Sequence, residues 1–219
     1  MHAQAVRALQ IAAELRAALI NGGLDVFYQP IVALDTLVPT SFEALVRWPH
    51  PTLGLLPPSE FIPLAETLDL IHDVGMQVLR MTCRDIRAWH DGLASSLPLR
   101  VSVNLSARQL ARHDLAEELL ETIDRSALPD RSIRFEVTES LLAKADGPAL
   151  ANLHALRAAG IDILIDDFGT GYSTLSYLHT MPCNQVKLDG SFVHSLTHDE
   201  RLRAIVRHSI EGTPDQLMF

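Results

Sequence analysis

The sequence predicts an α/β fold with a mainly parallel sheet, and three observations predict it. Helical and strand patterns alternate along the 219 residues. The strand segments are short apolar runs, and several of them finish in polar residues. This alternation is typical of a doubly wound sheet or a (β/α)8 barrel. The strands expected below are fewer than the eight that a closed barrel needs.

The first third of the chain predicts a helix and two paired strands. Apolar residues recur at helical spacing up to about Ile20, and Asn21-Gly22-Gly23 ends that helix. Residues 26–34 and 41–48 are expected to be strands. The turn residues between them favour antiparallel pairing. The prolines and Gly54 within 49–58 predict a long loop.

The middle of the chain begins with an amphipathic helix, whose apolar stripe is Ile71, Val74, Val78, Thr82, Ile86 and Trp89. Strands are expected at 99–106 and 132–139. Between them, Asp114 and Glu117 have capping-box spacing for a helix that runs to about Ile123.

The remaining elements repeat the strand and helix alternation. Pro148 and Gly160 bracket a helix over 149–159. A strand at 161–167 follows, ending in Asp166-Asp167. The pattern then predicts a short helix near 173–179, a strand at 184–189 and a last helix around 199–210.

Composition excludes some classes of function. A net charge of −9 argues against a broad surface for duplex nucleic acid. No stretch has the length and apolarity of a membrane span, so no membrane contact is expected. Cys83 and Cys183 form no CxxC pair and are expected to be reduced and structural. We expect a cytoplasmic protein.

Polar residues gather at the predicted strand ends. Asn104, Glu136, Asp166 and Lys187 each lie at or near the carboxyl end of a different strand. That edge carries the active site in barrels and in open α/β sheets. On the second strand, the period of two places Glu43, Leu45 and Arg47 on one face.

Carboxylates and an amide without a thiol or histidine cluster favour Mg²⁺ or Mn²⁺ over Zn²⁺. Asp166 followed by Asp167 could serve two ions, the usual device for displacement at phosphorus. Lys187 and Arg47 would neutralise phosphate oxygens. The alternative is that single acids cap helices or face solvent. Glu136 is the better ligand candidate, and Glu139 is expected to brace a loop.

Six motifs follow one another along the chain: Tyr28-Gln29-Pro30, FEALVRW (42–48), VSVNLS (101–106), FEVTES (135–140), DDFGTGYSTL (166–175) and VKLDGSF (186–192). In this order they resemble the EAL domain family, the bacterial cyclic di-GMP phosphodiesterases. The resemblance covers nearly the whole chain, as a single domain at 1–219 excised from a longer multidomain signalling protein.

The resemblance implies a modified (β/α)8 barrel with its first two strands antiparallel, and hydrolysis of cyclic di-GMP to linear pGpG with one or two Mg²⁺ or Mn²⁺ ions. The implied metal ligands are Glu43, Asn104, Glu136, Asp166 (bridging) and Asp167. The implied catalytic residues are Lys187, which orients or activates water, Glu139, which supports the DDFGTG loop, and Glu211. The implied nucleotide contacts are Gln29, Leu45, Arg47 and Asp189. A homodimer through the region near the DDFGTG loop is also implied.

The carboxyl end departs from the family pattern. Residues 207–219 read RHSIEGTPDQLMF, in which 211–212 and 213–216 resemble the two flanks of a longer family segment. The last two strands are therefore expected to be missing or incomplete. The sequence is expected to be a splice that omits residues, in which case Glu211 is the late site glutamate. The alternative is an internal deletion with an early stop.

Two other functions stay open at this point. The chain could be a catalytically inactive cyclic di-GMP receptor, which the incomplete carboxyl end favours and the intact ligand set through Lys187 opposes. It could also be a protein-interaction module, which no sequence feature selects.

Overall fold

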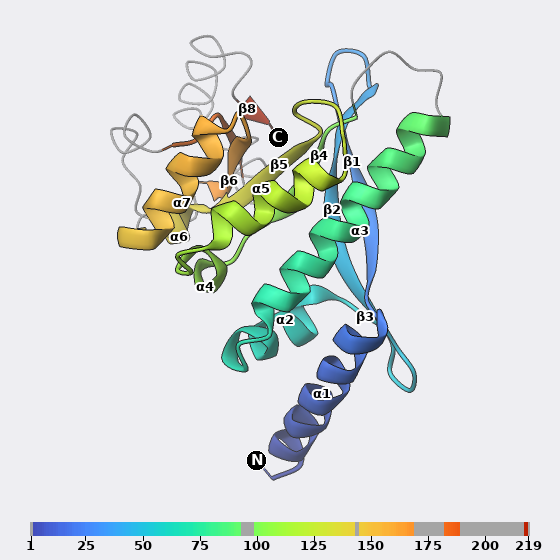
Figure 1. Cartoon of the computed structure of the whole chain (residues 1–219). Coiled ribbons are helices and arrows are strands. Elements are labelled where there is room, and N and C mark those ends of the chain that lie inside the picture. The colour runs from blue at the N-terminus through green and yellow to red at the C-terminus, as the bar shows by residue number, and fades with distance from the viewer. Residues whose placement is uncertain (1, 93–98, 143–144, 169–181, 189–216, 219) are drawn as a thin grey trace, which may run out of the picture.

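An antiparallel hairpin begins the sheet, and parallel strands follow it (Figure 1). The computed structural model describes residues 2–92, 99–142, 145–168, 182–188 and 217–218. The strands are β1 (Asp25–Val32), β2 (Pro39–His50), β3 (Gly54–Leu56), β4 (Val101–Asn104), β5 (Ile133–Thr138), β6 (Asp162–Phe168), β7 (Gln185–Leu188) and β8 (Leu217–Met218). The helices are α1 (His2–Asn21), α2 (Pro58–Thr67), α3 (Ile71–Gly92), α4 (Ala107–Leu110), α5 (Leu115–Arg125), α6 (Glu139–Leu142) and α7 (Gly147–Ala158).

The antiparallel pairing of β1 with β2 confirms the expectation for the first two strands. The connection between them covers only 33–38, whereas a parallel crossover needs about a dozen residues or more. Gln29 lies opposite Glu43 in this register, and Phe27 lies opposite Leu45. Side chains of the two strands therefore share faces at these positions.

From β2 through β4 to β8 the strands pair in parallel, as predicted, whereas the short β3 pairs antiparallel with β2. The strand order of the sheet is β1-β2-β4-β5-β6-β7-β8, and β3 lies outside this path. Among the described residues, β1 and β8 stand at the two ends of the path, so the sheet does not close. The last strand, β8, has two residues. Over the described residues, the fold is thus TIM-barrel-like with a sheet that stays open, which agrees with the expected incomplete last strands.

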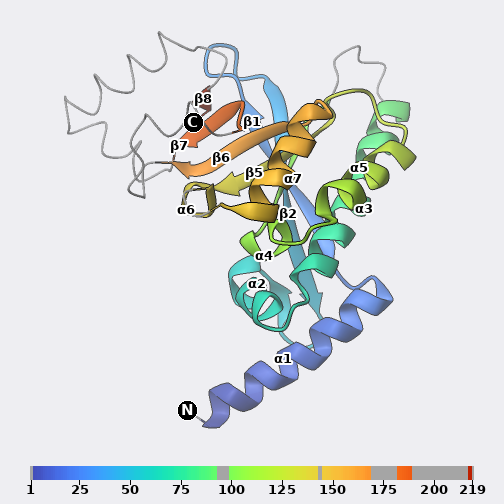
Figure 2. The same ribbon diagram turned by 60° about the vertical axis from the view of Figure 1, so that its left-hand side comes forward.

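Helices α3, α5 and α7 cover one face of the sheet (Figures 1 and 2). The predicted stripe of α3 is the part that packs: Ile71, Val74, Val78 and Ile86 are all buried. Trp89 continues the stripe and meets the Tyr28 ring edge-on, with 4.7 Å between centroids. Burial of this stripe is the main source of stability for the helix.

The prediction of a long loop over 49–58 was wrong in part. This segment contains β3, which pairs back onto the end of β2. Helix α2 then begins at Pro58, with Pro in its first turn. The prolines that suggested a loop are compatible with a helix start, because the first helical residues need no backbone N–H partner.

The predicted capping box at Asp114 and Glu117 was also wrong. Asp114 does precede α5, but its side chain makes no capping bond. Its carboxylate instead accepts a hydrogen bond from Arg112 Nη2 at 2.9 Å. A complete capping box lies one helix earlier, where Ser106 and Gln109 begin α4. The guanidinium offers a charged partner, which competes with the backbone amide.

The predicted helices near 173–179 and around 199–210, and the junction at 210–213, lie outside the described residues. Within the described ranges, no helix combines the length and apolarity needed to cross a bilayer.

Candidate metal centre

Strand β2 presents two chemically different faces. Ala44, Val46 and Trp48 are buried, whereas Glu43, Leu45 and Arg47 between them are only half-buried. This alternation is the one predicted from the period of two. Glu43 therefore points away from the helical layer, toward the interior of the curved sheet. We call this surface the site face.

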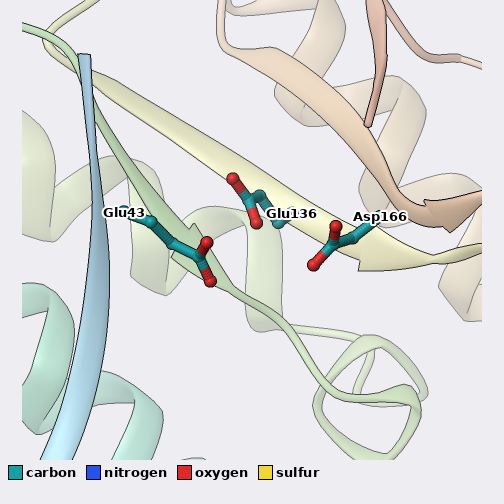
Figure 3. A group of neighbouring side chains, drawn as sticks. All are labelled: Glu43, Glu136 and Asp166. Atoms are coloured by element: carbon teal, nitrogen blue, oxygen red, sulfur yellow. The ribbon is translucent and has the colours of Figure 1, made fainter. Parts of the chain in front are cut away.

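Three carboxylates from three strands converge on the site face (Figure 3). Glu43 comes from β2, Glu136 from β5 and Asp166 from β6. Each offers one oxygen, and these oxygens all lie within 4.8 Å of one another. Like charges this close repel strongly, so the cluster needs a cation to offset them.

Lys187 from β7 supplies one positive charge to the cluster. Its Nζ lies 2.7 Å from Glu136 Oε2, 2.9 Å from Glu43 Oε2 and 3.3 Å from Asp166 Oδ1. Burial lowers the pKa of Lys187, but the carboxylates of Glu136 and Glu43 raise it by more, so the net shift is upward. Lys187 is therefore a cation in this arrangement, and its single positive charge faces three carboxyl groups.

Glu136 is the most enclosed member of the cluster. Its side chain is 0% exposed. Its Oε2 accepts from Lys187, whereas its Oε1 is buried without a hydrogen-bond partner among the described residues. Burial raises the pKa of this carboxyl, although the Lys187 ammonium opposes the shift. A buried carboxylate oxygen without a partner is costly, and a bound cation would remove that cost.

Asn104 joins the cluster from the end of β4. Its Nδ2 donates to Glu43 Oε1 at 3.0 Å. In the sheet it lies beside Glu136, and the backbone N–H of Leu105 donates to the Glu136 carbonyl at 2.8 Å. The amide oxygen of Asn104 adds a neutral oxygen donor next to the three acids.

This donor set fits a hard divalent cation. Carboxylate and amide oxygens are the ligands that Mg²⁺ and Mn²⁺ prefer, and the buried Glu136 Oε1 is an oxygen ligand without a hydrogen-bond partner in the described part of the chain. Glu43, Glu136 and Asp166, with Asn104 beside them, are the residues that could hold the ion.

Asp167 lies apart from this group of three acids. It is exposed, and its φ is +55°, the left-handed conformation that Asp tolerates better than most residues. The register of β6 against β7 shifts between Ile165 and Phe168, which surround it. The strand therefore directs Asp166 onto the site face and turns the chain at Asp167.

The predicted nucleotide contacts lie on the same surface. Gln29 is cross-strand from Glu43, and Leu45 and Arg47 follow Glu43 along β2. Arg47 Nη1 donates to the Val46 carbonyl, and its guanidinium lies 5.6 Å from the centroid of the Phe27 ring. Phe27 was not among the residues predicted from the sequence, although its place two residues before Gln29 puts it on the same face.

Glu139 is buried and begins α6, directly after β5. It thus lies at the carboxyl end of the strand that carries Glu136. Asp189 and Glu211 lie outside the described residues, as does the part of the DDFGTG loop after Phe168.

The turn after Asn104 is stabilised by a pair of hydrogen bonds that was not predicted from the sequence. Gln109 Oε1 accepts from the backbone N–H of Ser106, and Ser106 Oγ accepts from the backbone N–H of Gln109. Gly75 of α3 lies against this buried side chain: a Cβ there would lie 2.1 Å from Gln109 Nε2. The Ser-x-x-Gln spacing is a capping-box signal that could have revealed the turn.

A cavity of about 950 Å³ lies between α5 and α7, at the edge where β5 begins. Its lining includes Glu117, Asp124, Pro129 and Ile133 but none of the predicted site residues. It therefore belongs to the packing between neighbouring helices and not to the acidic cluster.

Comparison with known families gives a match over most of the chain. The family model described as the EAL domain matches residues 12–213. The chain is 41% identical over 230 residues to the cyclic di-GMP phosphodiesterase NbdA of Pseudomonas aeruginosa, covering 99% of this chain and 29% of that protein. It is 40% identical over 206 residues to the bifunctional diguanylate cyclase/cyclic di-GMP phosphodiesterase MucR of the same organism, covering 94% of this chain and 30% of MucR.

Solved structures agree with these matches. The PaMucR phosphodiesterase in complex with c-di-GMP superposes with a TM-score of 0.83 at 38% identity, over 94% of this chain and 82% of that one. The chain thus corresponds to one domain-sized part of the curated relatives, spanning less than a third of NbdA and of MucR.

Proposed function

The chain belongs to the EAL domain family, and we propose that it hydrolyses one phosphodiester bond of cyclic di-GMP by attack of an activated water. The observation that carries this proposal is the cluster of Glu43, Glu136 and Asp166 around Lys187. The relatives named as cyclic di-GMP phosphodiesterases support the choice of substrate.

Glu43, Asn104, Glu136 and Asp166 would hold Mg²⁺ or Mn²⁺, with Asp167 as a ligand for a second ion. When bound, a divalent ion lowers the pKa of a coordinated water and stabilises charge that develops on the phosphoryl oxygens. The residues of the chain then have separate roles around that centre.

Lys187 would orient the attacking water and keep two carboxylates in place. Its hydrogen bonds to Glu43 and Glu136, at 2.9 and 2.7 Å, fix one oxygen of each acid. Glu136 Oε1 has no partner among the described residues and remains available to a ligand, whereas Glu43 Oε1 accepts from Asn104 Nδ2 at 3.0 Å. An ammonium beside the phosphate would also offset the negative charge of the transition state.

Gln29, Leu45 and Arg47 would contact the nucleotide, since they extend from Glu43 over the same face. A guanidinium suits phosphate because its N–H groups match two oxygens at once. Asp189 would add a further nucleotide contact. Glu139 would support the DDFGTG loop, and Glu211 would serve as a late site glutamate.

We further propose pGpG as the product, a homodimer formed near the DDFGTG loop and a cytoplasmic location. The chain would act as the phosphodiesterase domain of a longer multidomain signalling protein.

Incubation with cyclic di-GMP and Mn²⁺, followed by chromatography, tests this function. Wild type should release pGpG, whereas Glu43→Gln should release at least about 100-fold less, because it loses an anionic ligand. Glu121→Gln is the matched control, since Glu121 pairs with Arg125 on exposed helix surface. Binding of cyclic di-GMP without any product would instead favour the inactive receptor, and the absence of binding would favour an interaction module.

A further inference from the structure

Phe27 is an aromatic side chain that the fold leaves 46% exposed. It lies in the middle of β1, where a side chain facing the helical layer would be covered. Its neighbours Val26 and Tyr28 point to that layer, and Tyr28 packs on Trp89. Phe27 therefore presents apolar surface on the opposite, site face. Exposure alone does not mark a binding site, but an aromatic ring on the face that carries the three acids gives a ligand bound there an apolar surface to pack on.

The strand register fixes where Phe27 stands relative to the acids. Phe27 lies opposite Leu45, and Gln29 lies opposite Glu43. Leu45 follows Glu43 on the site face of β2. Phe27, which pairs with Leu45, therefore lies closer to the carboxyl end of β2 than Gln29 does. That is the end of the sheet at which ligands bind in parallel α/β folds.

Arg47 lies next to this ring. Its guanidinium is 5.6 Å from the Phe27 centroid, and it follows Leu45 on the same face. The guanidinium lies over the ring, so the pair brings an aromatic surface and a positive charge to the same place on the site face. A nucleotide has the complementary parts, a base that stacks and a phosphate that carries negative charge.

We propose that Phe27 provides the stacking surface for one nucleobase of the substrate, beside a phosphate held through Arg47. This inference rests on the proposed hydrolysis of cyclic di-GMP and adds a specificity-determining residue to it. Stacking on an aromatic ring favours any base, so the contact selects nucleotides over simple phosphodiesters.

The test compares Phe27→Ala, Phe27→Leu and Phe27→Tyr with wild type. Steady-state kinetics give KM for cyclic di-GMP, and competition gives inhibition constants for GMP and inorganic phosphate. Loss of the ring should raise both the KM for cyclic di-GMP and the inhibition constant of GMP roughly 5- to 150-fold in the Ala and Leu variants. The inhibition constant of inorganic phosphate should stay within about two-fold of the wild-type value, because stacking involves no phosphate oxygen. Tyr keeps the ring and should behave as wild type.

The matched control is Leu34→Ala, an apolar residue 73% exposed just beyond the other end of β1, which should change none of these constants. The proposal is overturned if Phe27→Ala leaves KM and the GMP constant unchanged. It is equally overturned if the variant weakens GMP and phosphate alike, because Phe27 would then only support the fold.

Absence of turnover in wild type would contradict the proposed function and not this contact. In that case, calorimetric titration with GMP still tests the contact, and equal affinities for wild type and Phe27→Ala would overturn it.

Discussion

Lys187 Nζ lies 2.7 Å from Glu136 Oε2, and this pair joins β7 to β5 at the centre of the acidic cluster. The ammonium is the one described cation in contact with all three acids. It thus offsets part of the repulsion that a divalent ion would offset more completely. This relationship connects the stability of the fold to metal binding.

The first prediction concerns that connection. Lys187→Met should lower the free energy of unfolding in EDTA by about 3–5 kcal/mol, since it leaves the buried Glu136 carboxylate without its cation. Added Mn²⁺ should raise the melting temperature of the variant more than that of wild type, because the ion replaces the lost charge. Thermal unfolding with and without Mn²⁺ measures both effects.

The control for Lys187→Met is Arg125→Met, which removes a cation from an exposed pair with Glu121. Such pairs contribute about 0–1 kcal/mol, so this variant should respond to Mn²⁺ as wild type does. A Lys187→Met protein that gained no more from Mn²⁺ than wild type would contradict the link between the acids and the ion.

The second prediction concerns Gly75, where α3 meets the turn after Asn104. Gly75→Ala should cost about 1–3 kcal/mol of stability, because its Cβ would overlap Gln109 Nε2. It should also reduce turnover, since the displaced Gln109 would release the Ser106 backbone amide. Urea unfolding and the hydrolysis assay measure the two effects.

In Gly92→Ala, in the same helix, the added Cβ meets no atom of the described residues within 4 Å, and the variant should be neutral. Shortening the Gln109 side chain removes the overlap and should partly restore stability. The double variant Gly75→Ala, Gln109→Ala should therefore lose less unfolding free energy than the two single variants lose in total. Simple additivity would mean that the two residues do not interact.

The third prediction is a pH dependence at the α1 contact. Glu14 accepts from Gln10 Nε2 and lies 2.7 Å from His50 Nε2. The hydrogen bonds from Gln10 and His50 hold the pKa of Glu14 below its ordinary value of 4.5. The folded state thus favours the carboxylate, and its contribution to stability is present above pH 4.5 and lost as the pH falls through the folded pKa.

Glu14→Gln should therefore be less stable than wild type near neutral pH, and the difference should shrink in acid. Chemical unfolding at a series of pH values measures it. A difference that stayed constant down to pH 3, well below the ordinary carboxyl pKa, would contradict this assignment.

Much of the fold was predictable because its elements are periodic. The α3 stripe and the alternation of Glu43, Leu45 and Arg47 follow from helical and strand periods, and both agree with the observed burial. The short connection at 33–38 likewise dictated the hairpin. These features depend on local sequence, and for that reason a single chain reveals them.

The errors arose where one particular side-chain partner decides the outcome, whether that partner is near in the sequence or far. Asp114 was predicted to cap α5, but Arg112 takes its carboxylate. The role of Gly75 depends on Gln109, which lies on another helix. Within the candidate site, the converging strand ends were predictable, whereas the ion pairs of Lys187 and the exposure of Phe27 required the sheet register.

The most direct test of the account compares hydrolysis of cyclic di-GMP by wild type and by Glu136→Gln as Mn²⁺ is increased. We expect metal-dependent turnover in wild type and at least about 100-fold less in the variant at saturating Mn²⁺. The variant should also bind Mn²⁺ more weakly in calorimetry, since it loses an anionic donor. Wild-type turnover in Glu136→Gln, or hydrolysis that persists in EDTA, would contradict a metal centre built on these three acids.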